Sequence, residues 1–324
     1  MNLKHFANIK AGKQSAIAIA FCMYLIALFM NGSNGIVASG ISLSSSEIVF
    51  FRMAIGTLFL AAVFCGTRRK FTVLQNKREL ALLVGAGAAI SCELLFVYEA
   101  YRTAGVGMAT ILCYLGPIAV MALSPILFRE RLTIAKGVGF AVVVFGSLLV
   151  NISALGGGTS ITGIFCGLAS AAGLAAMIIL NKMVTKTPGL ERSLIQLGSC
   201  AVICGIYLAV TKGLPQVIAD TTAGGQWPAA VLVGALAAIA NLLYFSAVAK
   251  LPAQRVAVCG YLEPLSAVLM SVVILGEQML PLQVIGAALI IGGALFGEAA
   301  GKKHAGASAR PKVVFRPLRR RHAA

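Results

Sequence analysis

Three charged residues inside long apolar stretches are the first candidates for chemistry in this sequence. Glu93 and Glu263 each lie deep within such a stretch, and Arg52 lies within another. A charged side chain at the centre of a bilayer costs about 2.5–3.5 kcal/mol, so residues of this kind usually face the interior of a helix bundle. A carboxylate there can take up a proton or hold an ammonium group, and a guanidinium can hold a carboxylate or a phosphate. Glu93 and Glu263 are therefore candidates for proton coupling.

Each of these residues also has a structural interpretation. Arg52 lies at a depth similar to that of Glu93, so the two could form an ion pair that locks two helices, and the long side chain of Arg52 could also reach the membrane surface. We favour the structural role for Arg52 and the functional role for Glu93, whose side chain is too short to reach water. Glu263 precedes a proline and fits both roles equally. Glu99 lies three residues before Arg102, a spacing that predicts an ion pair on the helix surface.

Amides and phenols in the same stretches extend the candidate binding site. Side chains of this kind orient small polar solutes in a largely apolar pocket, although amides also form hydrogen bonds between membrane helices. Tyr98 also fits the aromatic belt found at membrane surfaces. The candidate substrate-binding residues are Asn31, Asn34, Glu93, Tyr98, Tyr114, Asn241, Tyr244 and Tyr261.

The sequence offers no set of residues for a metal or a cofactor, and we expect neither. The three histidines lie in the two tails, and the eight cysteines form no CxxC pair. No GxxxxGK[ST] loop is present, so energy must come from a gradient or from the solute itself. An intramembrane enzyme would need clustered His, Asp or Ser residues and a long active-site loop, and the apolar stretches supply neither. The chain is therefore not expected to be an enzyme.

Composition identifies lipid as the main solvent of the chain. Of its 324 residues, 59% are hydrophobic and 11% are charged, whereas a soluble domain is about 45–50% apolar and about 25% charged. This composition argues against a cytosolic enzyme and against a nucleic-acid-binding domain. A membrane helix needs about 20 mostly apolar residues. Ten candidate spans follow at residues 15–37, 48–66, 80–101, 106–128, 134–150, 161–181, 191–210, 229–249, 254–275 and 281–298.

The basic residues predict the orientation of these spans. Cytoplasmic connections carry an excess of Lys and Arg, and 24 of the 27 basic residues fall on one side when ten spans are drawn. Both termini are therefore expected in the cytoplasm. The net charge of +17 lies largely in short connections and tails, where it suits anionic lipid headgroups better than a nucleic acid. The expected fold class is an all-α integral membrane protein of ten transmembrane helices.

The second half of the sequence repeats the first at an offset of 147 residues. Tyr114-Leu115-Gly116-Pro117 aligns with Tyr261-Leu262-Glu263-Pro264, and Glu130 aligns with Glu277. Each half holds five spans, an odd number, so the second half must cross the membrane in the opposite sense. We expect a cytoplasmic tail over 1–13, a first repeat over 14–150, an external linker over 151–160, a second repeat over 161–298 and a basic cytoplasmic tail over 299–324.

Pro117 and Pro264 occupy equivalent places near the middle of two spans. A proline inside a helix removes one backbone hydrogen bond and leaves a carbonyl group free, and in lipid that group must find a partner or face a cavity. We therefore expect a helix kink at each proline. The kinks fit two interpretations equally: a bent helix that lines a substrate path, or a bend that serves packing alone.

With these motifs the chain resembles the drug/metabolite transporter superfamily, with two EamA-type repeats over about residues 15–298. The resemblance rests on Phe50-Phe51-Arg52, on the two Tyr-Leu-x-Pro segments, and on the segments Arg129-Glu130-Arg131 and Leu275-Gly276-Glu277. It implies a basket of ten helices around a central cavity and the export of small metabolites such as amino acids. Some members of this superfamily exchange solutes, and some are considered proton-coupled. The single tryptophan, Trp227, falls in an expected external loop, so a cage of tryptophans around the substrate is not available.

The sequence therefore predicts a secondary active transporter that moves a small polar metabolite, an amino acid or a similar solute, across the cytoplasmic (inner) membrane by alternating access. Export is the direction that the resemblance implies, and the two glutamates make proton coupling an option. A passive channel or uniporter is the alternative function, and an intramembrane lipid-modifying enzyme is a weaker one. The expected partners are a small-molecule solute and the lipid bilayer, with no nucleic acid. The sequence leaves the oligomeric state open, with a monomer as one option.

The orientation can be tested by labelling. In a cysteine-free variant, cysteines introduced at residues 37–47 and 276–280 should react with a membrane-impermeant maleimide added to intact cells, because both loops are expected outside. Cysteines introduced at residues 299–324 should react only after the cells are opened. Labelling of the two loops on different faces of the bilayer would contradict the inverted arrangement.

Overall fold

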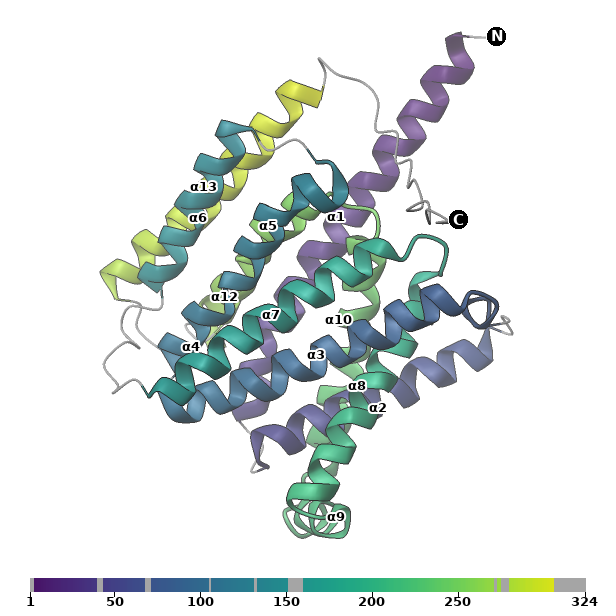
Figure 1. The fold of residues 1–324 in the computed structure, drawn as a ribbon, viewed down its shortest axis with the longest axis vertical. Helices are drawn as coiled ribbons and strands as arrows, with labels where there is room; N and C mark the ends of the chain where they lie inside the picture. The colour runs from purple at the N-terminus through teal and green to yellow at the C-terminus, as the bar shows by residue number, and fades with distance from the viewer. Residues whose placement is uncertain are drawn as a thin grey trace, which may run out of the picture.

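The computed structural model describes residues 3–39, 43–67, 71–104, 106–130, 133–150, 160–270, 273–274 and 280–305. Regular secondary structure in these residues is helical throughout, without a strand (Figure 1). The α-helices are α1 Leu3–Ser39, α2 Ser45–Gly66, α3 Lys77–Ala104, α4 Val106–Cys113, α5 Leu115–Phe128, α6 Ile134–Val150, α7 Ile161–Met183, α8 Gly189–Thr211, α9 Leu214–Ala223, α10 Trp227–Val248, α11 Ala253–Gly260, α12 Leu262–Met270 and α13 Pro281–Ala305.

The helices are apolar on their outer faces, as lipid requires. Large apolar side chains such as Ile126, Ile134 and Val210 are more than three-quarters exposed. Seven helical segments of the described chain are long and apolar enough to cross a membrane, and two further apolar helices, Ile134–Val150 and Pro281–Phe296, are shorter. The chain is therefore a multi-pass membrane protein.

Two of the expected spans are interrupted rather than continuous. The segment expected at 106–128 is divided into α4 and α5 by a turn at Tyr114, and the segment expected from residue 254 is divided into α11 and α12 by a turn at Tyr261. Each turn lies three residues before one of the two prolines for which a kink was predicted, Pro117 and Pro264. A proline cannot donate a hydrogen bond to the carbonyl four residues earlier, and its ring crowds that carbonyl. The regular helix is therefore interrupted just before the proline.

Two regions outside the expected spans are also helical. Residues 3–13, expected as a tail, belong to α1, because the stretch is free of proline and rich in residues that favour helix. The connection expected at 211–228 contains the short helix α9, in which Val217 and Thr221 are buried. Residues 151–159 of the expected linker and residues 306–324 of the expected C-terminal tail lie outside the described residues.

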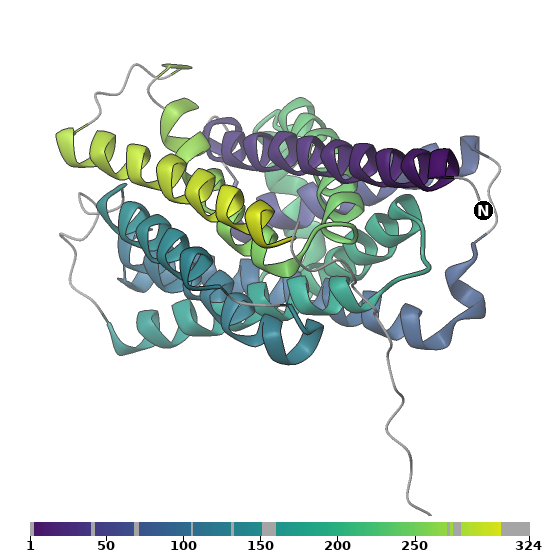
Figure 2. The ribbon, with the colours of Figure 1, turned by 90° about the horizontal axis from the view of Figure 1, so that it is seen from above.

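The helix pair α6 and α13 shows how the two repeats are related (Figures 1 and 2). A Cβ atom built on Gly146 would lie 2.7 Å from the carbonyl oxygen of Gly286, and one built on Gly293 would lie 2.7 Å from that of Gly139. Gly146 is the repeat equivalent of Gly293, and Gly139 is that of Gly286, so the contact is reciprocal and antiparallel. A two-fold axis running across the helices produces this pattern, and it is the relation that an inverted repeat requires.

The remaining helices interleave so that the main contacts join one repeat to the other. α3 packs against α7, and a Cβ atom on Gly173 would lie 2.8 Å from the backbone nitrogen of Glu93. α1 packs against α10, and the ring centroids of Tyr24 and Tyr244 are 5.4 Å apart. The hydrophobic core therefore lies between the repeats, and neither repeat can hold its helices in place alone.

The close approach of α6 and α13 predicts that alanine substitutions at two glycines of α6 have very different effects on stability. Gly146→Ala should destabilise the purified protein by about 1–3 kcal/mol, because the added methyl group meets backbone atoms that cannot yield. Gly137→Ala in the same helix meets nothing within 4 Å and should leave the thermal unfolding midpoint in detergent unchanged or slightly raised. Equal midpoints for the two variants would contradict the packing.

Candidate functional site

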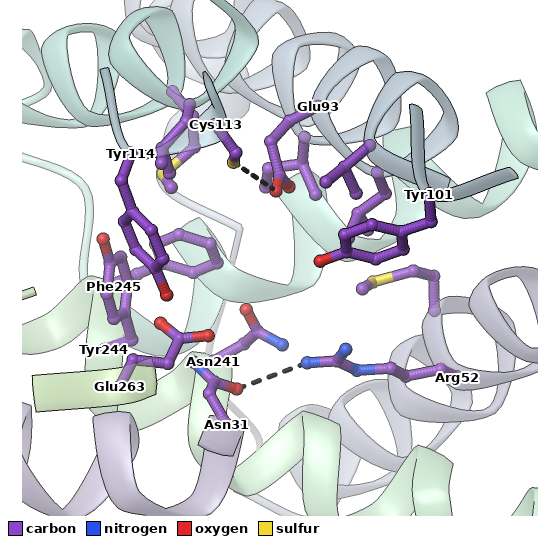
Figure 3. Close-up of a pocket in the computed structure, with 16 residues that line it drawn as sticks. Asn31, Arg52, Glu93, Tyr101, Cys113, Tyr114, Asn241, Tyr244, Phe245 and Glu263 are labelled. Carbon is purple, nitrogen blue, oxygen red and sulfur yellow. Dashed lines mark hydrogen bonds between the residues drawn. The ribbon is translucent and has the colours of Figure 1, made fainter. Parts of the chain in front are cut away.

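A cavity of about 190 Å³ lies between the two repeats, close to both helix breaks. Residues of α1, α2, α3, α4, α7, α10 and α12 and the turn at Tyr114 form its wall (Figure 3). The lining residues are Asn31, Arg52, Met53, Ile90, Glu93, Leu94, Val97, Tyr101, Cys113, Tyr114, Leu174, Met177, Asn241, Tyr244, Phe245 and Glu263.

Arg52 on α2 supplies the positive charge of the wall. Its Nη2 donates a hydrogen bond to Oδ1 of Asn31 on α1 at 3.2 Å, and its buried Nε has no partner among the described residues. The ion pair expected between Arg52 and a glutamate is not formed in the described part of the chain. Figure 3 shows Arg52 facing Glu263 across the cavity, with Asn31 and Asn241 between them, so the guanidinium is presented to the cavity.

Two carboxylates supply the negative charge of the wall. Glu93 lies on α3, and its Oε1 accepts a long contact of 3.9 Å from the thiol of Cys113 at the end of α4. The same Cys113 sulfur accepts from the hydroxyl of Ser170 on α7 at 3.3 Å. Glu263 reaches the cavity from the first turn of α12, directly after the break at Tyr261. Within the described residues neither carboxylate forms an ion pair, so both stay available to a solute or a proton.

The cavity brings together most of the predicted binding residues, from three helices and the turn at Tyr114. Asn31, Glu93, Tyr114, Asn241 and Tyr244 all contribute to its wall. Both proton-coupling candidates, Glu93 and Glu263, are also part of the wall.

Other predicted residues lie elsewhere. Tyr98 and Tyr261 are not part of the wall, and the side chain of Asn34 lies outside the described residues. Glu99 pairs with Arg102 on the helix surface at 2.5 Å, which confirms the predicted ion pair. Trp227 begins α10 and packs edge-on against Phe51, with ring centroids 5.4 Å apart, outside the cavity.

The cavity wall contains Tyr101 of α3 rather than Tyr98, the tyrosine of α3 that was selected from the sequence. Tyr101 lines the cavity, and the ring of Tyr98 packs edge-on against the ring of Tyr101, with centroids 5.7 Å apart. Glu93, Val97 and Tyr101 recur every four residues and so lie along one helix face, and Tyr98 lies at the edge of that face, about 60° around the helix from Tyr101. Cys113 was not among the residues selected from the sequence, and no sequence signal places its thiol beside Glu93.

A cluster of polar contacts that ties the repeats together lies at the end of α5, outside the cavity wall. The carboxylate of Glu130 accepts hydrogen bonds from the backbone nitrogens of Ala253 at 2.6 Å and Gln254 at 3.0 Å, at the N-terminus of α11. Lys136 at the start of α6 donates to Oε1 of Gln254 at 2.8 Å, and within the second repeat Lys182 of α7 donates to the carbonyl of Leu251. A carboxylate suits the positive end of a helix dipole, so Glu130 of one repeat caps a broken helix of the other.

A second tie joins the start of α2 to the connection between α8 and α9. Lys212 lies 2.6 Å from a carboxylate oxygen of Glu47 and 2.7 Å from one of Asp220. The hydrogen bond from Lys212 lowers the pKa of Asp220, and the bonds to Asp220 and Glu47 raise the pKa of Lys212. Each shift favours the charged forms, so the cluster stays paired at neutral pH.

Comparison with known protein families provides evidence that is separate from this geometry. The model of the EamA-like transporter family matches residues 18–152 and, a second time, residues 161–296. The two matches correspond to the two repeats whose helices interleave around the cavity.

Individual relatives agree with this family match. The protein named Uncharacterized transporter YxxF of Bacillus subtilis (strain 168) is 24% identical over 291 residues, which cover 87% of this chain and 90% of its own. The protein named Uncharacterized transporter of Archaeoglobus fulgidus is 33% identical over 110 residues, which cover 34% of this chain and 38% of its own. A solved crystal structure shares the fold with a TM-score of 0.74 at 18% identity, covering 89% of this chain and 99% of that one.

The capping role of Glu130 can be tested against another glutamate. Glu130→Gln should lower the thermal unfolding midpoint in detergent, because a side chain that caps a helix N-terminus contributes about 0.5–2 kcal/mol. Glu99→Gln removes the same charge from an exposed surface pair, which contributes little to stability. Equal effects of the two substitutions would show that the charge of Glu130, rather than its position, matters.

Proposed function

Because the chain belongs to the EamA-like transporter family, we propose that it is a secondary active transporter that moves a small polar metabolite across the cytoplasmic membrane by alternating access. The observation that carries this proposal is the cavity between the two repeats, in which Arg52, Glu93 and Glu263 face a common space inside an otherwise apolar bundle. Intramembrane charges of this kind mark solute and ion pathways. The position of the cavity between inverted repeats supports alternating access.

The proposed topology has ten spans with both termini in the cytoplasm. In this topology α4 with α5 and α11 with α12 each form one interrupted span, and α6 and α13 are short spans. The alternation of basic connections along the sequence supports the orientation. The tie at Glu130 then lies on the cytoplasmic side and the tie at Lys212 on the external side, so each tie is placed to control access from one side.

The charges of the cavity favour an amino acid or a similar solute that carries both an ammonium and a carboxylate group. The guanidinium of Arg52 suits a carboxylate, which it can bind through two parallel hydrogen bonds. Glu93 and Glu263 suit an ammonium group, and Asn31 and Asn241 offer both donors and acceptors. The cavity of about 190 Å³ is smaller than the roughly 300–1,000 Å³ of pockets for drug-sized ligands, which favours a small metabolite.

Proton coupling would use the same two carboxylates. A buried carboxylate without a counter-charge is costly to keep ionised, so Glu93 or Glu263 takes up a proton when the solute leaves and releases it when the solute's ammonium group binds. With both carboxylates in the wall of one cavity, the proton and the solute compete for the same groups. Export from the cytoplasm, the direction that the family resemblance implies, would then be driven by the entry of protons.

Flux measurements in proteoliposomes distinguish the transporter from its alternatives. Vesicles loaded with unlabelled amino acids should accumulate labelled amino acid by counterflow, and an imposed pH gradient should change the initial rate. A passive channel gives no counterflow. Flux that ignores the pH gradient would refute proton coupling alone, and a chemically altered product would indicate an enzyme.

Glu93→Gln should reduce accumulation by about tenfold or more, because a hydrogen bond to a charged group contributes about 1.5–3 kcal/mol. Glu99→Gln is the matched control six residues further along α3, where the glutamate lies in an exposed surface pair, and it should transport at the parental rate. Normal accumulation by Glu93→Gln, with both variants inserted equally into the membrane, would remove Glu93 from the site.

A further inference from the structure

Two tyrosines at equivalent positions of the repeats contact each other beside the cavity. Tyr114 and Tyr261 lie 147 residues apart, which is the offset of the repeat, and each occupies a helix break three residues before a proline. Their ring centroids are 5.2 Å apart, with the ring planes inclined by 33°. A residue that contacts its own repeat equivalent must lie at the pseudo-two-fold axis. The pair therefore marks the axis about which the repeats exchange roles.

The two tyrosines differ in what their hydroxyl groups do. The hydroxyl of Tyr261 donates a hydrogen bond to the main-chain carbonyl oxygen of Tyr114 at 2.6 Å. Tyr261 is 1% exposed, and its ring packs edge-on against Phe140 with centroids 5.8 Å apart. The hydroxyl of Tyr114 has no hydrogen-bond partner among the described residues and projects into the cavity near Glu263 and Tyr244 (Figure 3). Tyr261 thus fastens one helix break to the other, whereas Tyr114 is part of the cavity wall.

The helix breaks make the hydrogen bond between Tyr261 and Tyr114 possible. In an uninterrupted helix the neighbouring turns surround each carbonyl, but the turn at Tyr114 opens its carbonyl oxygen to a donor from outside the helix. A carbonyl oxygen can accept two hydrogen bonds, and a buried tyrosine hydroxyl needs a partner. Tyr261 occupies the equivalent break, so its carbonyl is the corresponding acceptor that we expect for a donor from the other repeat.

We propose that Tyr261 is a positioning residue that holds Tyr114 in the cavity wall, and that the opposite-facing state makes the reverse bond, from the hydroxyl of Tyr114 to the carbonyl of Tyr261. This inference rests on the transport by alternating access proposed above. In an inverted repeat the two facing states interchange the conformations of the two halves. The exchange withdraws Tyr114 from the cavity and delivers Tyr261 into it.

The exchange gives the solute a means of controlling the conformational equilibrium. A solute can shift an equilibrium only by contacts that differ between the two states. A solute that accepts a hydrogen bond from Tyr114 makes that contact in the described state alone, because Tyr114 donates to Tyr261 in the other state. The tyrosine pair therefore couples the presence of a solute to the side on which the cavity opens.

Thiol accessibility tests the exchange without any knowledge of the solute. The reporter is Leu94→Cys, in the cavity wall, introduced into a full-length variant that lacks the native cysteines. A membrane-impermeant methanethiosulfonate is added to right-side-out and to inside-out membrane vesicles. The ratio of the two labelling rates reports how the protein divides its time between the two facing states.

Phenylalanine substitutions keep the stacked rings and remove one hydroxyl each. Tyr261→Phe should change the labelling ratio by about fivefold, the factor that one net hydrogen bond contributes to an equilibrium constant. Tyr114→Phe should change the ratio by a similar factor in the opposite direction. The double variant should return the ratio close to that of the reporter parent, since each state has then lost one bond. Tyr207→Phe, at an exposed tyrosine of α8, is the control and should leave the ratio unchanged.

The outcomes separate this proposal from the proposed function. Labelling of the parent from one side only would refute alternating access and the transporter with it. Labelling from both sides, combined with shifts of the two variants in the same direction or with no shift, would overturn the tyrosine exchange alone. If Tyr261→Phe fails to accumulate in the membrane, Tyr114→Phe decides the matter, because an unchanged ratio in that variant would overturn the proposal.

Discussion

A helix that crosses lipid must satisfy its backbone hydrogen bonds internally, and two prolines at equivalent positions prevent two spans of this protein from doing so. The helices break at Tyr114 and Tyr261, three residues before Pro117 and Pro264. Irregular backbone at this depth is tolerated only where protein covers it or where it borders a cavity. The cavity, the tyrosine contact and the position of Glu263 in the first turn of α12 all depend on these two breaks.

The repeats surround the breaks with two kinds of contact. Gly139, Gly146, Gly286 and Gly293 bring α6 and α13 together at van der Waals distance, which suits a pair of helices that moves as one body. Polar ties such as the cap of Glu130 on α11 join the repeats at helix ends. A hydrogen bond can be exchanged for another at little net cost, whereas a packed glycine contact cannot, so motion between the repeats is easier at the ties than within the pair.

Much of the candidate site was predictable from residue type and depth alone. Glu93, Asn241 and Tyr244 were selected because polar groups inside apolar spans are costly, and the structure places all three in one cavity. Arg52 was assigned to an ion pair, but its guanidinium faces the cavity and bonds to Asn31. That difference depends on which neighbouring helix α2 faces at the depth of Arg52, and residue type and depth do not specify a neighbour.

Residue order is sufficient to identify this chain as a helical membrane protein built from two repeats. Hydropathy and proline positions are properties of single segments, and the 147-residue offset follows from comparing two of them. Tertiary structure alone decided which repeat each helix packs against, that Glu130 caps a helix of the other repeat, and that Tyr261 bonds to Tyr114 while Tyr114 faces the cavity. The physical reason lies in the repeat itself. Equivalent positions such as Tyr114 and Tyr261 stand in the same local Tyr-Leu-x-Pro motif, and only their packing in space gives the two tyrosines different roles.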